Sequence, residues 1–207
     1  MKKKIVIIDL EVNNIFSIHN ILNNLSDEIL ISNKKTDIIH AKKIILPGNG
    51  SFGNAMKKVN DFGLKEIIKD VVNSGTPTLG ICLGMQLFFE SSEEDKNFKG
   101  LGILNGNVKK LNVDSGCSLP HIGWNNVSFQ KSKCKLFQDI NSGTNFYFAN
   151  SYSCHLDYNL VDFYSYTDHC KCKFVSSFSY NNIYGVQFHP EKSQKFGFKL
   201  LNNFLNI

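Results

Sequence analysis

The sequence predicts an α/β fold: a mostly parallel sheet with helices on both faces and an antiparallel β extension in the second half. Short apolar runs alternate with amphipathic segments in the first half, which is typical of a parallel sheet. From Gly100 to Tyr184 the pattern changes to short β-rich runs separated by turns. The chain has 207 residues, 42% of them hydrophobic, so we expect one domain over residues 1–207.

Each element follows from its local pattern. Apolar runs in the first half predict four strands: Lys4–Leu10, Glu28–Ser32, Lys43–Leu46 and Thr76–Ile81. Periodic apolar residues between them predict three helices: Asn14–Leu25, Ser51–Val59 and Gly63–Val72. The β-rich runs of the second half are Asn107–Leu111, Asn145–Tyr152, Phe163–Thr167, Phe174–Ser179 and Ile183–Phe188. Ser193 is expected to cap a final helix that carries Phe196, Leu200 and Phe204 on one face.

Composition narrows the class of protein. All 23 basic residues are lysine and they are scattered, so a net charge of +5 does not indicate a nucleic-acid partner. Lys2–Lys4 precede only four apolar residues, too few for a signal peptide, and no run is long enough for a membrane span. We therefore expect a cytoplasmic protein whose six cysteines are reduced thiols. Chance explains Cys170-Lys171-Cys172 better than a metal site, and we expect neither metal nor cofactor.

Cys82 is the strongest candidate for a catalytic residue. The predicted strand Thr76–Ile81 runs directly into it, Gly80 and Gly84 bracket it, and an apolar-periodic helix is expected to follow. A strand, a sharp turn and a helix form a nucleophile elbow, in which the backbone comes too close for side chains beside the nucleophile. The helix N-terminus would favour the thiolate. The alternative is a buried, unreactive cysteine, the commoner role of a single Cys.

A cysteine nucleophile needs a base and a group that orients the base. His189 follows the predicted strand Ile183–Phe188, Pro190 stiffens the turn, and Glu191 lies two residues further on. A carboxylate at that spacing can hold the imidazole in the correct tautomer. Acyl transfer also needs amides that face the developing oxyanion. The Gly48-Asn49-Gly50 turn and the amide of Leu83 could supply them, although an ordinary strand-to-helix turn explains the first equally well.

Two sets of motifs carry a resemblance to a known family. The first set is Gly80-Ile81-Cys82-Leu83-Gly84-Met85-Gln86, His189-Pro190-Glu191 and Pro47-Gly48-Asn49-Gly50. The second set is Pro120-His121-Ile122-Gly123-Trp124-Asn125, Tyr147-Phe148-Ala149-Asn150-Ser151-Tyr152 and the segment Phe188–Ser193. The first set resembles the class I (triad) glutamine amidotransferases, and the resemblance runs from Ile5 to the final helix. Within that family, the second set resembles the glutaminase subunits of imidazole glycerol phosphate synthase.

The resemblance implies a flavodoxin-like fold and a role for each matching residue. Cys82 would attack the side-chain amide of glutamine, with His189 as base, Glu191 as orienting group, and the amides of Asn49 and Leu83 as oxyanion hole. Ammonia would pass to a (β/α)8-barrel cyclase subunit in a heterodimer, to form imidazole glycerol phosphate and an aminoimidazole ribotide in histidine biosynthesis. The implied substrate-binding residues are Gly48, Gly50, Gln86, Glu94, Ser151 and Tyr152. The implied partner contacts are Trp124, Asn125, Tyr147 and Lys192, although core packing is an equal alternative for Trp124 and Tyr147.

Three positions depart from the family pattern, and they leave alternatives open. The segment Asp9–Asn14 lacks the usual glycines, so Glu11 is expected to adopt an unfavourable backbone conformation. Asn49 stands where a branched apolar residue is usual, and Asn150 where a histidine is usual. One alternative is a paralogous glutaminase that supplies ammonia for amidination of a nucleotide-linked surface-glycan sugar. Others are a cysteine hydrolase of peptides and a non-catalytic regulatory subunit.

Overall fold

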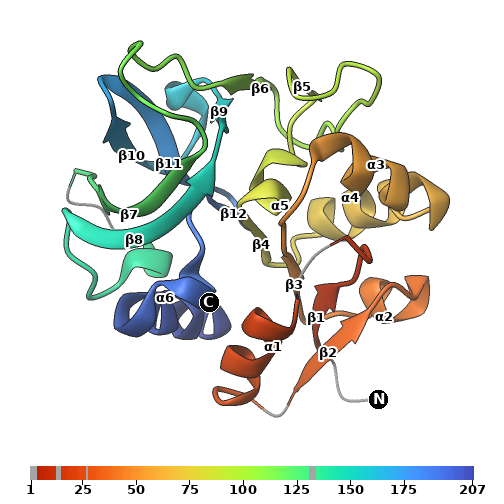
Figure 1. The fold of residues 1–207 in the computed structure, drawn as a ribbon. Coiled ribbons are helices and arrows are strands. Elements are labelled where there is room, and N and C mark those ends of the chain that lie inside the picture. The colour runs from red at the N-terminus through yellow and green to blue at the C-terminus, as the bar shows by residue number, and fades with distance from the viewer. Residues whose placement is uncertain (1–3, 13–14, 27, 131–133) are drawn as a thin grey trace.

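The structure is a computed structural model that describes residues 4–12, 15–26, 28–130 and 134–207. Its centre is a seven-stranded sheet in the order β10-β11-β12-β4-β3-β1-β2 (Figure 1). The five strands from β12 to β2 are parallel, whereas β10 and β11 pair antiparallel at one end. The predicted α/β fold with an antiparallel extension is therefore confirmed.

The strands of this sheet are β1 (Ile5–Ile8), β2 (Ile29–Ser32), β3 (Lys43–Leu46), β4 (Thr78–Ile81), β10 (Phe163–His169), β11 (Cys172–Tyr180) and β12 (Ile183–Val186). Successive side chains of a strand point to opposite faces, and the core is divided accordingly. Val6 and Ile8 pack against α3 (Phe52–Asp61) and α4 (Lys65–Asn73). Ile5 and Ile7 pack against α1 (Phe16–Asn23) and α6 (Gln194–Leu205) on the other face (Figure 1).

Some helices differ from the prediction. Helix α1 is shorter than Asn14–Leu25, and Asn14 itself lies outside the described residues. The short helix α2 (Lys35–Ile39) was not predicted, because five residues are too few to show a helical period. Helix α5 (Leu83–Gln86) has only four residues, so the elbow is followed by a single turn rather than by the longer helix expected. The positive electrostatic potential at Cys82 therefore comes from the first backbone amides of that turn more than from a long helix dipole.

The second half also forms two small sheets that the sequence did not predict. One contains β5 (Ser91–Ser92), β6 (Asn107–Lys110) and β9 (Tyr152–His155), and the other pairs β7 (His121–Val127) with β8 (Thr144–Asn150). The predicted strand Asn145–Tyr152 is thus divided at Ser151. Its two parts turn toward different partners, which brings Tyr152 close to the elbow.

Two expectations about single residues are wrong. Ser193 stands at the N-cap of α6 but makes no capping hydrogen bond; its hydroxyl donates to the carbonyl of His189 at 2.6 Å. Cys117 and Cys170 form a disulfide, so not all six cysteines are reduced, and the other four are free thiols. The disulfide joins the segment before β7 to the turn after β10, a proximity that no local pattern encodes.

None of the helices in the described part of the chain has the length and apolar character that a membrane crossing requires.

Candidate active site

Cys82 occupies a strained turn between β4 and α5. Its φ is +52° and its ψ is −110°, a conformation that costs energy for a residue with a side chain and that is common at functional sites. Its amide donates to the carbonyl of Val186 at 2.7 Å, which ties the elbow to the end of β12. A Cβ on Gly84 would lie 1.8 Å from the Leu46 carbonyl oxygen, so only glycine fits beside the nucleophile.

The base and its orienting carboxylate lie at the same edge of the sheet. His189 follows β12, the parallel neighbour of β4, and its Nδ1 and Oε1 of Glu191 are 2.7 Å apart. Burial alone would lower the pKa of His189, yet the charge of the nearby Cys82, followed by the hydrogen bond and charge of Glu191, raises that pKa to about 10. The arrangement therefore favours an imidazolium next to Cys82 at neutral pH.

The other ring nitrogen of His189 is free for chemistry. Within the described residues Nε2 is buried without a hydrogen-bond partner, although Cys82 is close enough to influence the charge of the ring. Catalytic hydrogen bonds are often long before substrate binds. Nε2 is therefore the atom that can exchange a proton with Cys82 or with a leaving group.

The glycine-rich turn after β3 lies against the elbow, as an oxyanion hole requires. A Cβ on Gly48 would lie 2.3 Å from the amide nitrogen of Gly84 and 2.4 Å from Cβ of Leu83. Gly50 has a φ of +105°, and a Cβ there would meet the Val12 carbonyl at 3.5 Å. The turn that carries Asn49 therefore packs between the first turn of α5 and the loop after β1.

The predicted substrate-binding residues divide into two groups. Gln86 is buried, and its Nε2 donates to the carbonyl of Tyr152 at 3.2 Å and to Oε1 of Gln187 at 3.0 Å. Gln86 and Tyr152 thus lie at the elbow, whereas the carbonyl of Ser151 accepts the amide of Leu111 at 2.9 Å. Glu94 accepts a hydrogen bond from the amide of Phe52 at 2.9 Å, which places it at the start of α3 beyond the glycine-rich turn.

Sequence reasoning missed Gln187. Its side chain is fully buried, and its Nε2 lies 3.5 Å from the sulfur of Cys82 as a donor. A glutamine in an otherwise apolar strand end, Val186-Gln187-Phe188, was the available signal, because a buried amide needs hydrogen-bond partners.

Comparison with known proteins identifies the family. The profile of the glutamine amidotransferase class-I family matches residues 6–207. The chain belongs to the class I glutamine amidotransferases. Among its relatives, the imidazole glycerol phosphate synthase subunit HisH of Pyrococcus furiosus is 44% identical over 205 residues, which cover 99% of each chain. The protein of the same name from Methanocaldococcus jannaschii is 42% identical and covers 97% of this chain and 98% of its own.

Solved structures agree at the level of the fold. PurLQS from Thermotoga maritima aligns with a TM-score of 0.73 at 18% identity and covers 100% of this chain and 99% of its own. The glutaminase domain of CTPS from Trypanosoma brucei aligns with a TM-score of 0.68 at 14% identity, and the alignment covers 99% of this chain and 94% of that one. The chain therefore has the fold of the amidotransferases.

One face of this amidotransferase presents exposed aromatic and apolar groups close to the base. Trp124 on β7 is 48% exposed and meets the ring of Tyr147 on β8 edge-on, with centroids 6.1 Å apart. Lys192 lies over the Tyr147 ring at 5.5 Å, and the Tyr147 carbonyl accepts the amide of His189 at 2.8 Å. Core packing is therefore excluded for Trp124. We call Trp124, Tyr147 and Lys192 the aromatic face.

Asn125 does not belong to this face. Its Nδ2 donates to the carbonyl of Asp168 at 2.9 Å and lies 3.3 Å from Nε2 of His121. Neighbouring residues of a strand point to opposite sides of it. The side chain of Asn125 therefore contacts β10, whereas Trp124 faces solvent.

The unusual loop residue Glu11 is strained as expected. Its φ is +56°, and its carboxylate pairs with Lys58 at 2.7 Å, which holds the loop after β1 against α3. Asn13 lies outside the described residues.

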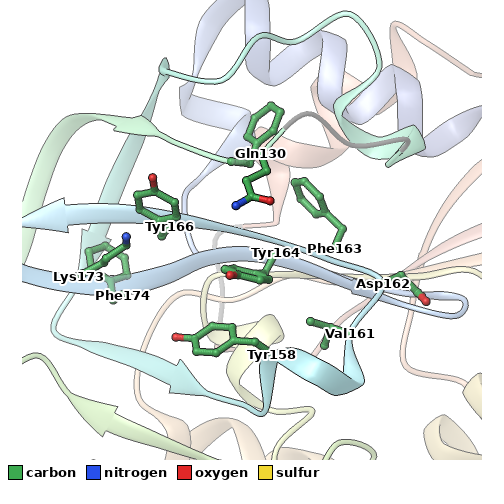
Figure 2. Close-up of a pocket in the computed structure, with 10 residues that line it drawn as sticks. Gln130, Tyr158, Val161, Asp162, Phe163, Tyr164, Tyr166, Lys173 and Phe174 are labelled. Atoms are coloured by element: carbon green, nitrogen blue, oxygen red, sulfur yellow. The ribbon is translucent and has the colours of Figure 1, made fainter.

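The amidotransferase also has a cavity that Cys82 does not line. It measures about 590 Å³ and lies on the outer strands β10 and β11, with aromatic side chains and Lys173 around it (Figure 2). None of Cys82, His189 or Glu191 lines it. Among the described residues no group of three or more His, Cys, Asp or Glu could hold a metal ion.

His121 gives the fold a pH dependence that can be measured. It is buried between Phe148 and His169, and burial, followed by the charge of His169, lowers its pKa to about 4. Between pH 6.5 and 4 the unfolded chain binds a proton at this position and the folded chain does not, so stability falls as the pH decreases. We expect His121→Leu to lose less stability than wild type between about pH 7 and about pH 5 in urea unfolding.

The matched control is His40→Leu, which removes an exposed histidine. An equal loss of stability in wild type and in His121→Leu over this range would contradict the assignment.

Proposed function

We propose that the chain is the glutaminase subunit of an imidazole glycerol phosphate synthase, which hydrolyses glutamine and passes the ammonia to a (β/α)8-barrel cyclase subunit. The observation that carries this proposal is the site geometry: a strained cysteine at a glycine-bracketed elbow, beside a histidine whose Nδ1 lies 2.7 Å from a carboxylate. The proposed role in histidine biosynthesis is supported by relatives named imidazole glycerol phosphate synthase subunit HisH, which are 40–44% identical over nearly the whole chain.

The residues act in sequence on the amide of glutamine. The Cys82 thiolate attacks the carbonyl carbon, and the amides of Asn49 and Leu83 stabilise the oxyanion. His189 gives its Nε2 proton to the leaving nitrogen, so that ammonia departs and a thioester forms. Neutral His189 then takes a proton from water, which attacks the thioester and releases glutamate. Glu191 holds Nδ1 throughout and stabilises each imidazolium.

Solvent reaches little of the catalytic pair in this structure, since Cys82 is 7% exposed and His189 is 1% exposed. The glycine-rich turn packs against the elbow at Gly48. In this proposal, movement of that turn admits glutamine to the sulfur. A partner can drive such a movement only if it binds the open form more tightly.

The aromatic face is the proposed docking surface for the cyclase subunit. Its Trp124 and Lys192 are exposed and its Tyr147 is half-buried, and the Tyr147 carbonyl accepts the backbone amide of His189. Exposed aromatic residues of this kind are the usual anchors of protein interfaces. A partner that moves Tyr147 would therefore also move His189, through the hydrogen bond between the His189 amide and the Tyr147 carbonyl.

Genetic complementation tests the function. Together with its cognate cyclase subunit, the chain is expected to restore growth of a histidine auxotroph that lacks the glutaminase subunit. In vitro, glutamine hydrolysis should be slow for the isolated chain and should rise at least about tenfold when the cyclase and its ligand are added. Failure to complement despite glutaminase activity would instead support the glycan-sugar paralogue.

A further inference from the structure

We propose that Gln187 is a positioning residue for the nucleophile: its amide N–H donates to the sulfur of Cys82, and Gln86 fixes the orientation of that amide. The inference rests on the proposed function, because it takes Cys82 to be the attacking group. It assigns Gln86 a role that differs from direct contact with substrate.

Contacts within the core determine the orientation of the Gln187 amide. The carbonyl of Tyr152 can only accept hydrogen bonds, so the group of Gln86 that lies 3.2 Å from it must be the amino group. The same amino group lies 3.0 Å from Gln187, which must therefore present its oxygen to Gln86. The amino group of Gln187 then faces the Cys82 sulfur, 3.5 Å away.

Further hydrogen bonds hold both partners in place. The side chain of Asn150 also donates, through Nδ2, to the Tyr152 carbonyl at 3.0 Å. The backbone N–H of Gln187 donates to the Ser176 carbonyl at 2.8 Å. Both glutamines are buried, Gln187 completely. Protein contacts alone thus hold the side-chain NH2 of Gln187 pointing at the sulfur of Cys82.

A donor in this position acts on the ionisation of the sulfur. A thiolate accepts hydrogen bonds far better than a thiol, so a fixed N–H stabilises the charged form. The titratable groups near Cys82 are His189 from the turn after β12, Glu191 through His189, and Cys154 on β9. Burial, followed by the charge of Cys82, raises the pKa of Cys154 well above its ordinary value, so this neighbour stays a neutral thiol. Among the side chains of the described residues, Gln187 therefore acts on the sulfur together with His189.

The test measures alkylation of Cys82 against pH in the complex with the cyclase subunit. Iodoacetamide is the probe, and mass spectrometry of the Cys82 peptide separates it from the other free thiols. In Gln187→Met, the midpoint of the rate profile should rise by about one pH unit or more, because hydrogen bonds to charged groups correspond to factors of ten or more. Turnover should fall by a similar factor, with the KM for glutamine within about twofold of wild type.

Two further variants make the result specific. Gln86→Met leaves the donor but removes its orienting partner, so it should shift the midpoint in the same direction by less. Ser176→Ala changes a buried polar residue next to Gln187 and should leave the midpoint unchanged. If Gln187→Met does not fold, Gln187→Asn keeps an amide but shortens its reach, and it should show the same shift.

The outcomes separate this inference from the proposed function. An unchanged midpoint in a folded Gln187 variant, with an active wild-type complex, would overturn the positioning role and leave only core packing. A wild-type complex without glutaminase activity would overturn the proposed function instead.

Discussion

Cys82→Ala is expected to abolish glutamine-dependent synthesis in the complex, with glutamine hydrolysis reduced by roughly 10⁴-fold or more. The thioester cannot form without the sulfur, and no other nucleophile takes its place on the strained turn between β4 and α5. Synthesis supplied with an ammonium salt should continue, because that step belongs to the partner subunit. Parallel assays with glutamine and with ammonium salt give both rates.

The matched control for this variant is Cys154→Ala. Cys154 is also buried and lies close enough for Cys82 to influence its charge, but the mechanism gives it no part. Its complex should retain glutamine hydrolysis. Retention of hydrolysis by the Cys82→Ala complex would show that the nucleophile has been misassigned.

Glu191→Gln should lower turnover by about 10² to 10⁴-fold while the KM for glutamine changes little. Glu191 contacts the base and not the substrate, and its side chain is only 7% exposed, so the lost charge is not replaced by solvent. The neutral amide no longer stabilises the imidazolium, and the pKa of His189, raised to about 10 in part by this carboxylate, should fall. Steady-state kinetics across pH measures both effects.

The comparison for this variant is Glu66→Gln, which removes the same charge from a side chain that is 71% exposed. Its kinetics should match wild type. If Glu191→Gln keeps full turnover at every pH, the carboxylate does not orient the base.

Much of the site could be predicted because the chemistry requires it locally. A nucleophile elbow needs glycines next to the nucleophile, and Gly84 is indeed confined by the Leu46 carbonyl. A histidine and a carboxylate two residues apart can meet within one turn, as His189 and Glu191 do. These relations involve few residues and short separations, so the sequence contains them.

Other features depend on contacts between distant segments. Gln187 gains its role only because β9 brings the Tyr152 carbonyl to Gln86, and the division of a predicted strand at Ser151 makes that possible. The Cys117–Cys170 disulfide joins residues 53 apart in the chain. Helix α5 ends after one turn, although its apolar continuation reads as helix. Packing between distant segments determines the Gln187 contacts, the disulfide and the end of α5. Composition and periodicity describe only local sequence, so they do not predict such packing.

The burial of Cys82 also bears on the chemical lifetime of the enzyme. Oxidation of a cysteine to sulfenic and then to sulfinic acid follows thiolate character and exposure. Cys82 is a residue only 7% exposed, so little of it meets peroxides in the surrounding solution. Oxidative damage should therefore accumulate slowly, and mainly when the site is open and empty of glutamine.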